Sequence, residues 1–107
     1  MRVLVLHSDP TIAHLLSDAL SRLGLDTVTE PEPVCDLALV PWNDWDRNTC
    51  RRLLAVGQRC AERVVIMLEG GDPPADYAGP LLPAPCGPAD LARLVRQTCG
   101  SRRAVPL

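Results

Sequence analysis

The strongest constraint on the fold is the alternation of short aliphatic runs with amphipathic segments. Residues 3–6 form a continuous aliphatic run, typical of a strand that is buried on both faces of a parallel sheet. Asp9 and Pro10 follow, and they supply an N-cap and a proline at the first helical position. Helical spacing then continues to Gly24, with a predicted inward stripe of Ile12, Leu15, Leu16, Ala19, Leu20 and Leu23.

Further strands are predicted at residues 26–29, 36–40, 64–68 and 81–82. Pro31 and Pro33 leave no room for a helix between the second and third strands. The run of glycines and prolines over residues 69–74 predicts a loop, and it reduces the next helix to at most a turn at residues 75–78.

Two more helices are predicted. The first begins after a cap at Asn43 or Asp44 and has Asp46 in its first turn; its inward stripe comprises Cys50, Leu53, Leu54, Gly57 and either Cys60 or Ala61. The last helix opens at residues 87–90 and ends at Gly100; its inward residues are Leu91, Leu94, Val95 and Thr98.

A length of 107 residues fits one domain. Strands that alternate with helices imply an α/β fold, in which right-handed crossovers build a parallel sheet that is covered on both faces. We expect a single domain over residues 1–100 and a flexible C-terminal tail over residues 101–107.

Charge and cysteine content exclude several classes of function. The net charge is −2 and the basic clusters, such as Arg51-Arg52 and Arg102-Arg103, are short, so binding to nucleic acid is disfavoured. The five cysteines lack a C-x-x-C pair and metal-ligand spacing, which predicts reduced core residues. The N-terminal apolar run is too short for a signal peptide or a membrane span, so we expect a cytoplasmic protein without membrane contact.

Over roughly residues 3–99 the chain resembles the receiver domain of bacterial response regulators in two-component signalling. The acidic pair that follows the first strand in that family falls on His7 and Ser8, and the phosphoacceptor aspartate falls on Pro41. The family's hydroxyl after the fourth strand falls on Leu68, with Glu69 as the one-residue alternative. The lysine of its lysine–proline pair falls on Ala84, whereas Pro85 and the later pair Asp90 and Leu91 match the family.

The resemblance implies a flavodoxin-like, five-stranded parallel sheet of order 2-1-3-4-5, with the second helix absent and the fourth minimal. It also implies a degenerate pseudo-receiver, because aspartyl phosphorylation needs a carboxylate nucleophile, oxygen ligands for Mg²⁺ and a cation or hydroxyl for the phosphoryl oxygens. We expect no enzymatic activity and no cofactor. The implied function is a phosphorylation-independent protein–protein interaction module in signalling or regulation, bound to a protein partner or to a second copy.

Two alternatives stay open at this point. The first is a small-ligand or metal sensor at the carboxyl ends of the strands, with His7, Asp9, Asp44 and Glu69 as its ligands, although Asp9 also fits a helix cap. The second is a receiver that is still phosphorylated in spite of its lost residues, which acetyl phosphate would reveal.

Trp42 and Trp45 flank the loop that follows the missing phosphoacceptor. They fit two roles, packing over the sheet or anchoring a protein interface with Arg47, Arg51 and Arg52 as its rim. The loss of helices is expected to leave apolar sheet surface uncovered, and a partner or a second copy would bury such a surface.

Overall fold

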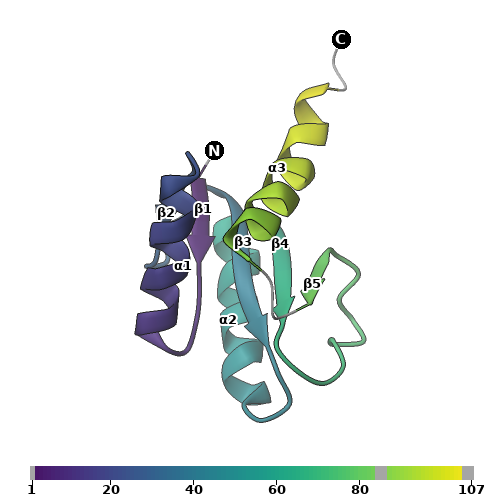
Figure 1. Cartoon of the computed structure of the whole chain (residues 1–107). Coiled ribbons are helices and arrows are strands. Elements are labelled where there is room, and N and C mark those ends of the chain that lie inside the picture. Colours follow the sequence, from purple (N-terminus) through teal and green to yellow (C-terminus); the bar gives the residue numbers. More distant parts are fainter. Residues whose placement is uncertain (1, 84–86, 105–107) are drawn as a thin grey trace.

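The computed structural model describes residues 2–83 and 87–104. A parallel five-stranded sheet of order β2-β1-β3-β4-β5 forms its centre, so the predicted α/β fold class and strand order are confirmed (Figure 1). The elements are β1 (Arg2–Val5), α1 (Pro10–Arg22), β2 (Asp26–Val28), β3 (Cys35–Trp42), α2 (Arg47–Cys60), β4 (Ala61–Leu68), β5 (Leu81–Pro83) and α3 (Pro88–Ala104).

The helices cover both faces of the sheet and divide the core in two (Figure 1). On one face, Leu20 of α1 and Val95 of α3 are buried among the sheet residues. The guanidinium of Arg96 on α3 also donates to the carbonyl of Leu23, which ties the two helices together. On the other face, α2 packs through Cys50 and Leu54.

The first helix begins as predicted, but its inward stripe is rotated. Asp9 accepts a hydrogen bond from the backbone nitrogen of Thr11 at 2.9 Å, which confirms Asp9 as the N-cap. Ala13 and Leu20 are the buried residues of α1, whereas Leu15 is 65% exposed. The prediction that Leu15 points inward was wrong. Leu15 follows the buried Ala13 by two residues, so its side chain is rotated by about 200° around the helix axis and points to the opposite side.

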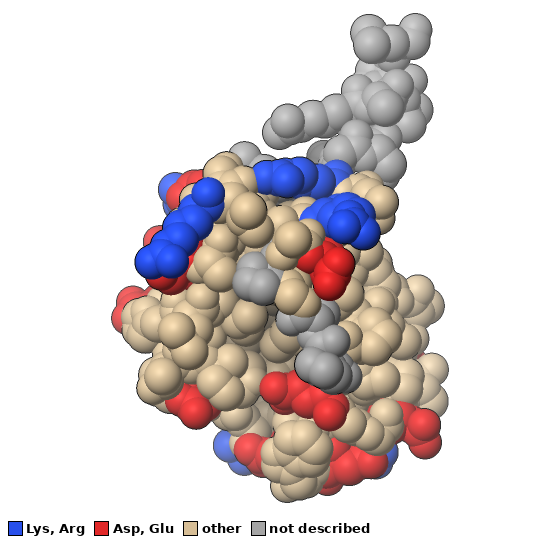
Figure 2. Space-filling model, in the orientation of Figure 1, with Lys and Arg blue, Asp and Glu red and all other residues tan. Residues whose placement is uncertain are grey.

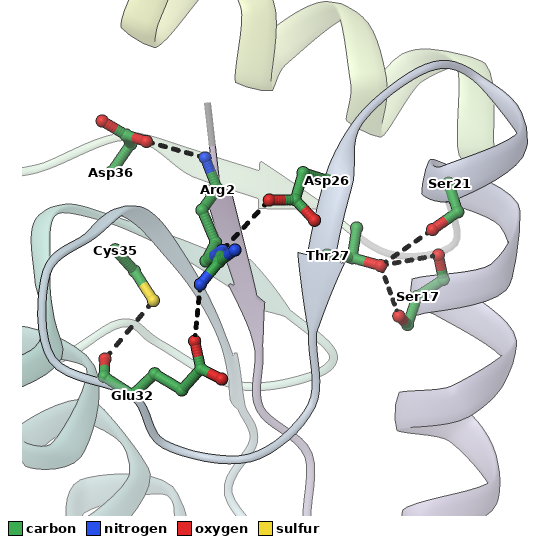
Figure 3. A network of polar contacts seen from close by, with 8 residues as sticks. All are labelled: Arg2, Ser17, Ser21, Asp26, Thr27, Glu32, Cys35 and Asp36. Atoms are coloured by element: carbon green, nitrogen blue, oxygen red, sulfur yellow. Dashed lines mark hydrogen bonds and ion pairs between the residues drawn. The ribbon is translucent and has the colours of Figure 1, made fainter.

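Side chains at the amino ends of β1 and β2 hold the connection between β2 and β3, which has no helix, as predicted (Figure 3). The guanidinium of Arg2 contacts Asp26 at 3.0 Å and Glu32 at 2.9 Å, and its backbone nitrogen donates to Asp36 at 2.7 Å. The segment ends at Val34, which is 92% exposed and has a φ of 68°. Arg2 therefore fixes the path of the chain where the family has a helix.

Tyr77 covers the sheet where the fourth helix of the family would lie. Residues 69–80 contain no more than a turn, as predicted, and Tyr77 packs against the apolar cluster on the α2 side of the sheet. Its hydroxyl lies 2.6 Å from the carbonyl oxygen of Pro80 and 2.9 Å from that of Val64. The expectation of uncovered apolar sheet surface was wrong, since Leu4, Val40 and Ile66 on this face are completely buried.

The ends of α2 and α3 differ from the prediction. Asp46 occupies the N-cap position of α2, so it does not lie in the first turn, and the predicted stripe is confirmed by the burial of Cys50, Leu54 and Gly57. Helix α3 continues through Gly100 to Ala104, so Gly100 does not end it. A glycine inside a helix costs only about 1 kcal/mol relative to alanine, so a single glycine does not by itself end a helix. Residues 105–107 lie outside the described part.

Among the described residues, no helix combines the length and apolar character that crossing a membrane requires.

Candidate functional site

Three turns meet at the edge of the sheet where the strands end. They follow β1, β3 and β4 and comprise residues 6–9, 43–46 and 69–72. In open parallel sheets ligands bind outside the carboxyl ends of the strands, so this edge is the place to look for a site.

His7, Asn43 and Glu69 form one polar network at this edge. The Nε2 atom of His7 lies 3.0 Å from Oε2 of Glu69, and the amide nitrogen of Asn43 donates to Oε1 of the same carboxylate at 3.0 Å. The amide oxygen of Asn43 accepts from the backbone nitrogen of Asp46 at 2.9 Å. The side chain of His7 is 6% exposed and that of Glu69 is 20% exposed. The network therefore occupies a nearly closed space.

Hydrogen bonds on both sides of the ring define the tautomer of His7. The backbone nitrogen of Asp9 donates to Nδ1 at 3.0 Å, so Nδ1 carries no proton. The ring proton then resides on Nε2 and is donated to Glu69. His7 is thus a neutral donor to a carboxylate, and both of its nitrogens are used inside the protein.

The positions that correspond to the family's phosphorylation residues are spread over different environments. His7 lies in the network, whereas Ser8 is exposed. Leu68 packs against the apolar cluster on the α2 side, and the side chain of Glu69 meets His7. Of the two alternatives for the family's hydroxyl, Glu69 is therefore the one at this edge. Ala84 lies outside the described residues.

Pro41 is buried inside β3, and its place explains why a proline is tolerated there. Alternate residues of β3 bond to its two neighbours: Leu39 accepts from Leu6 at 3.0 Å, and Trp42 accepts from Glu69 at 2.7 Å. The backbone of Pro41 has the same orientation as that of Leu39 and faces β1. Pro41 lies beyond the last β1 residue that pairs with β3. Its missing N–H is thus not needed in the ladder.

The two tryptophans have different roles. Trp42 is completely buried, its indole nitrogen donates to the carbonyl of Asp72 at 2.8 Å, and the guanidinium of Arg51 lies 5.5 Å from the ring centroid. Trp42 is therefore a core residue, and its assignment as an interface candidate was wrong. Trp45 is 72% exposed and lies against Gly70, where an added Cβ would come within 2.8 Å of the ring.

The predicted rim arginines are also placed differently. Arg47 pairs with Asp44 at 3.2 Å, and Arg51 stacks on the buried Trp42. Arg52 is exposed on α2. Arg47 and Arg52 are thus exposed, and Arg51, which is exposed as well, lies over the ring of Trp42.

Of the four residues of the alternative metal site, His7 and Glu69 are in contact, whereas the carboxylates of Asp9 and Asp44 have other partners. Asp9 caps α1, Asp44 pairs with Arg47, and Glu69 is held by His7 and Asn43. Within residues 2–83 and 87–104, no group of three or more metal-binding side chains comes together. The family's Mg²⁺ needs several oxygen ligands, and the described carboxylates of this edge do not come together as such a group, so the edge does not fit it.

Acidic side chains gather along the edge with the three turns, the lower edge in Figure 2. The acids contributed by these turns and the adjoining segment are Asp9, Asp44, Asp46, Glu69, Asp72 and Asp76. Apart from Arg47, no arginine lies within residues 6–9, 43–47 or 69–76.

The described cysteines are free thiols. Cys35 and Cys50 are buried, and desolvation by burial raises the pKa of both thiols. Cys35 and Cys50 are therefore core residues, as predicted. Cys86 and the side chain of Cys99 lie outside the described part.

Sequence comparison finds no protein family that matches this chain, and no curated protein matches it either. Among solved structures, the chain is similar to the crystal structure of a two component transcriptional regulator AraC from Clostridium phytofermentans ISDg. The match has a TM-score of 0.56 and 14% sequence identity, and it covers 94% of this chain and 93% of that chain. It establishes a fold like that of a response regulator.

Two residues were missed or misassigned from the sequence, Asn43 at the edge with the three turns and Tyr77 on the α2 side of the sheet. Asn43 was expected to cap a helix, but it also donates to Glu69. Tyr77 was not singled out, although it is the only tyrosine and stands in a segment rich in glycine and proline. A lone aromatic residue between two strands is the sequence feature that would have identified it.

Proposed function

We propose that this chain is a receiver-like module that takes up no phosphoryl group and acts by binding another protein in signalling or regulation. The observation that carries the proposal is the network of His7, Asn43 and Glu69, which fills the edge where a receiver performs its chemistry. In this chain the side chains of the network at this edge are hydrogen-bonded to one another.

The side chains at this edge do not support phosphoryl transfer. A nucleophilic carboxylate is required at the end of the third strand, where this chain has Pro41, Trp42 and Asn43. Glu69 offers a carboxylate, but both of its oxygens accept hydrogen bonds from His7 and Asn43. Attack on a phosphoryl donor would require breaking that network. We therefore assign the module no enzymatic role.

The surface around Trp45 supports a binding role. An exposed tryptophan is an unusual surface residue, and tryptophan is enriched among residues that dominate the energy of protein interfaces. Trp45 lies between Asp44 and Asp46 on the acidic edge, with Arg47 and Arg52 close in sequence. A partner with lysine or arginine side chains would complement the acidic charge and would stack a cation on the indole ring.

Treatment with acetyl phosphate and Mg²⁺, followed by intact mass measurement, tests the absence of phosphorylation. We expect no gain of a phosphoryl group under conditions that modify a phosphorylatable receiver treated alongside. A stoichiometric gain that hydroxylamine removes would show an acyl phosphate and would contradict the proposal.

Affinity purification from the organism of origin tests the binding surface. The bait is the full chain, with Trp45→Ala as the matched variant and Val34→Ala as the control at another exposed apolar residue. We expect a specific partner to be lost with Trp45→Ala and retained with Val34→Ala. Retention with both variants would place the interface elsewhere, and the absence of any specific partner would contradict this binding role.

A further inference from the structure

The outward face of α1 carries apolar side chains that nothing in the described structure covers. Leu15 is 65% exposed and Ile12 is 37% exposed. Thr11, His14, Leu15 and Asp18 line an open hollow of about 510 Å³ on this face. Figure 2 shows the face of α1 as a largely uncharged surface with acidic and basic side chains at its margins.

The lining residues have a symmetric spacing. Thr11 and Asp18 are equally far from the midpoint between His14 and Leu15. If a second α1 lies antiparallel across a two-fold axis at that midpoint, Thr11 faces Asp18 of the second copy and His14 faces its Leu15. The Thr11 hydroxyl then meets Oδ1 of Asp18 twice, since Oδ2 of Asp18 pairs with Arg22 of its own helix, and each Leu15 enters the hollow of the other copy. The face is therefore complementary to itself.

Charge at the ends of α1 favours the same arrangement. Asp9 stands at the N-terminus of the helix, and Arg22 lies in its last turn, where it pairs with Asp18 of the same helix at 2.9 Å; all three side chains are exposed. An antiparallel pair brings the Arg22 end of one helix beside the Asp9 end of the other, and the helix dipoles are opposed. A parallel pair would place like charges together.

We propose that the chain forms a two-fold symmetric dimer through α1, in which Leu15 fills the hollow lined by Thr11, His14 and Asp18 of a second copy. This inference rests on the proposed function and identifies a second copy of the chain as the partner of the α1 face. Two helix faces bury less area than the standard protein interface of roughly 1,600 Å², so the dimer is in exchange with monomer. With such a weak affinity, the fraction of dimer changes with the protein concentration.

Sedimentation equilibrium of the full chain over a wide concentration range tests the dimer. We expect a monomer–dimer equilibrium in which Leu15→Asp raises the dissociation constant by at least about tenfold, because two leucines leave the interface. Val34→Asp is the matched control, since Val34 is equally apolar, even more exposed and on a different segment. Circular dichroism should show that both variants keep the fold.

A mixing experiment tests the two-fold geometry. Leu15→Asp and Leu15→Arg should each be monomeric, because like charges meet near the axis, and an equimolar mixture should recover a heterodimer. A wild-type chain that stays monomeric at every concentration would overturn the inference, as would a dimer that Leu15→Asp leaves intact. Capture of a different protein through Leu15 by a monomeric chain would also overturn it, and would leave the proposed binding function standing.

Discussion

The Nε2–H of His7 donates to Oε2 of Glu69 at 3.0 Å, and this contact joins the turn after β1 to the turn after β4. Asn43, from the turn after β3, binds the other oxygen of the same carboxylate. In a receiver this edge must stay open to a phosphoryl donor and a metal ion. In this chain one carboxylate connects all three turns, so His7, Asn43 and Glu69 stabilise the edge.

Substitution of Glu69 by glutamine should destabilise the protein by about 1 to 3 kcal/mol. The carboxylate accepts from donors on both sides, and the new amide group would face one of those donors with a donor of its own. His7 cannot relieve the conflict by changing its tautomer, because Asp9 donates to Nδ1. Urea unfolding measures the change. Glu30→Gln, at an exposed carboxylate, is the control and should shift stability by less than about 0.5 kcal/mol.

The stabilising contribution of Tyr77 should be lost in alkali. Burial raises the pKa of the Tyr77 hydroxyl, so the folded state favours the protonated phenol more than the unfolded chain does. This contribution to stability is complete below the unfolded pKa of about 10 and is lost as the pH rises through the higher pKa of the folded state. Because Tyr77 is the only tyrosine, the phenolate absorbance of the native protein reports its pKa directly.

The Tyr77→Phe variant separates this effect from other alkaline titrations. It should be less stable at neutral pH by about 1 kcal/mol, because the carbonyls of Pro80 and Val64 lose their hydroxyl donor. The difference between the two proteins should then shrink above the native pKa. A difference that stays constant across the alkaline range would argue that the hydroxyl is not buried.

The elements that could be predicted from sequence are those that local rules define. Asp9 and Pro10 set the start of α1, and the aliphatic residues of the central strands set the sheet, because capping and burial depend on neighbours in the chain. The loss of the second helix also followed from Pro31 and Pro33. These features need no knowledge of the tertiary structure.

The side-chain partners at the edge could not be predicted in the same way. Whether Leu68 or Glu69 faces His7 depends on where β4 ends, and one residue reverses the direction of a side chain on a strand. The indole nitrogen of the buried Trp42 donates to the carbonyl of Asp72, which is 30 residues away in the sequence. Leu15 fits a helical stripe as well as Leu16 does, and only the packing of α1 on the sheet separates them. Tertiary contacts decided each of these cases.

Cys35 and Cys50 should react slowly with iodoacetamide in the native protein. Burial raises the pKa of both thiols, so the reactive thiolate is scarce at neutral pH, and the side chains are closed to the reagent. Peptide mapping after timed alkylation should show labelling at least about tenfold slower than in urea, where both thiols are free. Equal rates in the two conditions would mean that these cysteines are accessible in the folded chain.

The two tryptophans should be distinguishable by fluorescence. In Trp45→Phe the remaining emission comes from the buried Trp42, and it should be blue-shifted and resistant to acrylamide. In Trp42→Phe it comes from Trp45, and it should be red-shifted and readily quenched. Trp42→Phe should also cost about 1 to 3 kcal/mol, because the carbonyl of Asp72 loses its donor and a smaller ring leaves a void.

Trp45→Phe should change stability much less, since most of that side chain already contacts solvent. The comparison decides whether Trp45→Ala is a clean probe of binding. If Trp45 emission resisted quenching in the isolated monomer, the ring would be covered by the protein itself. The loss of a partner with Trp45→Ala would then report a changed fold. Ready quenching in the monomer, followed by protection on addition of a partner, would instead identify the ring as part of the interface.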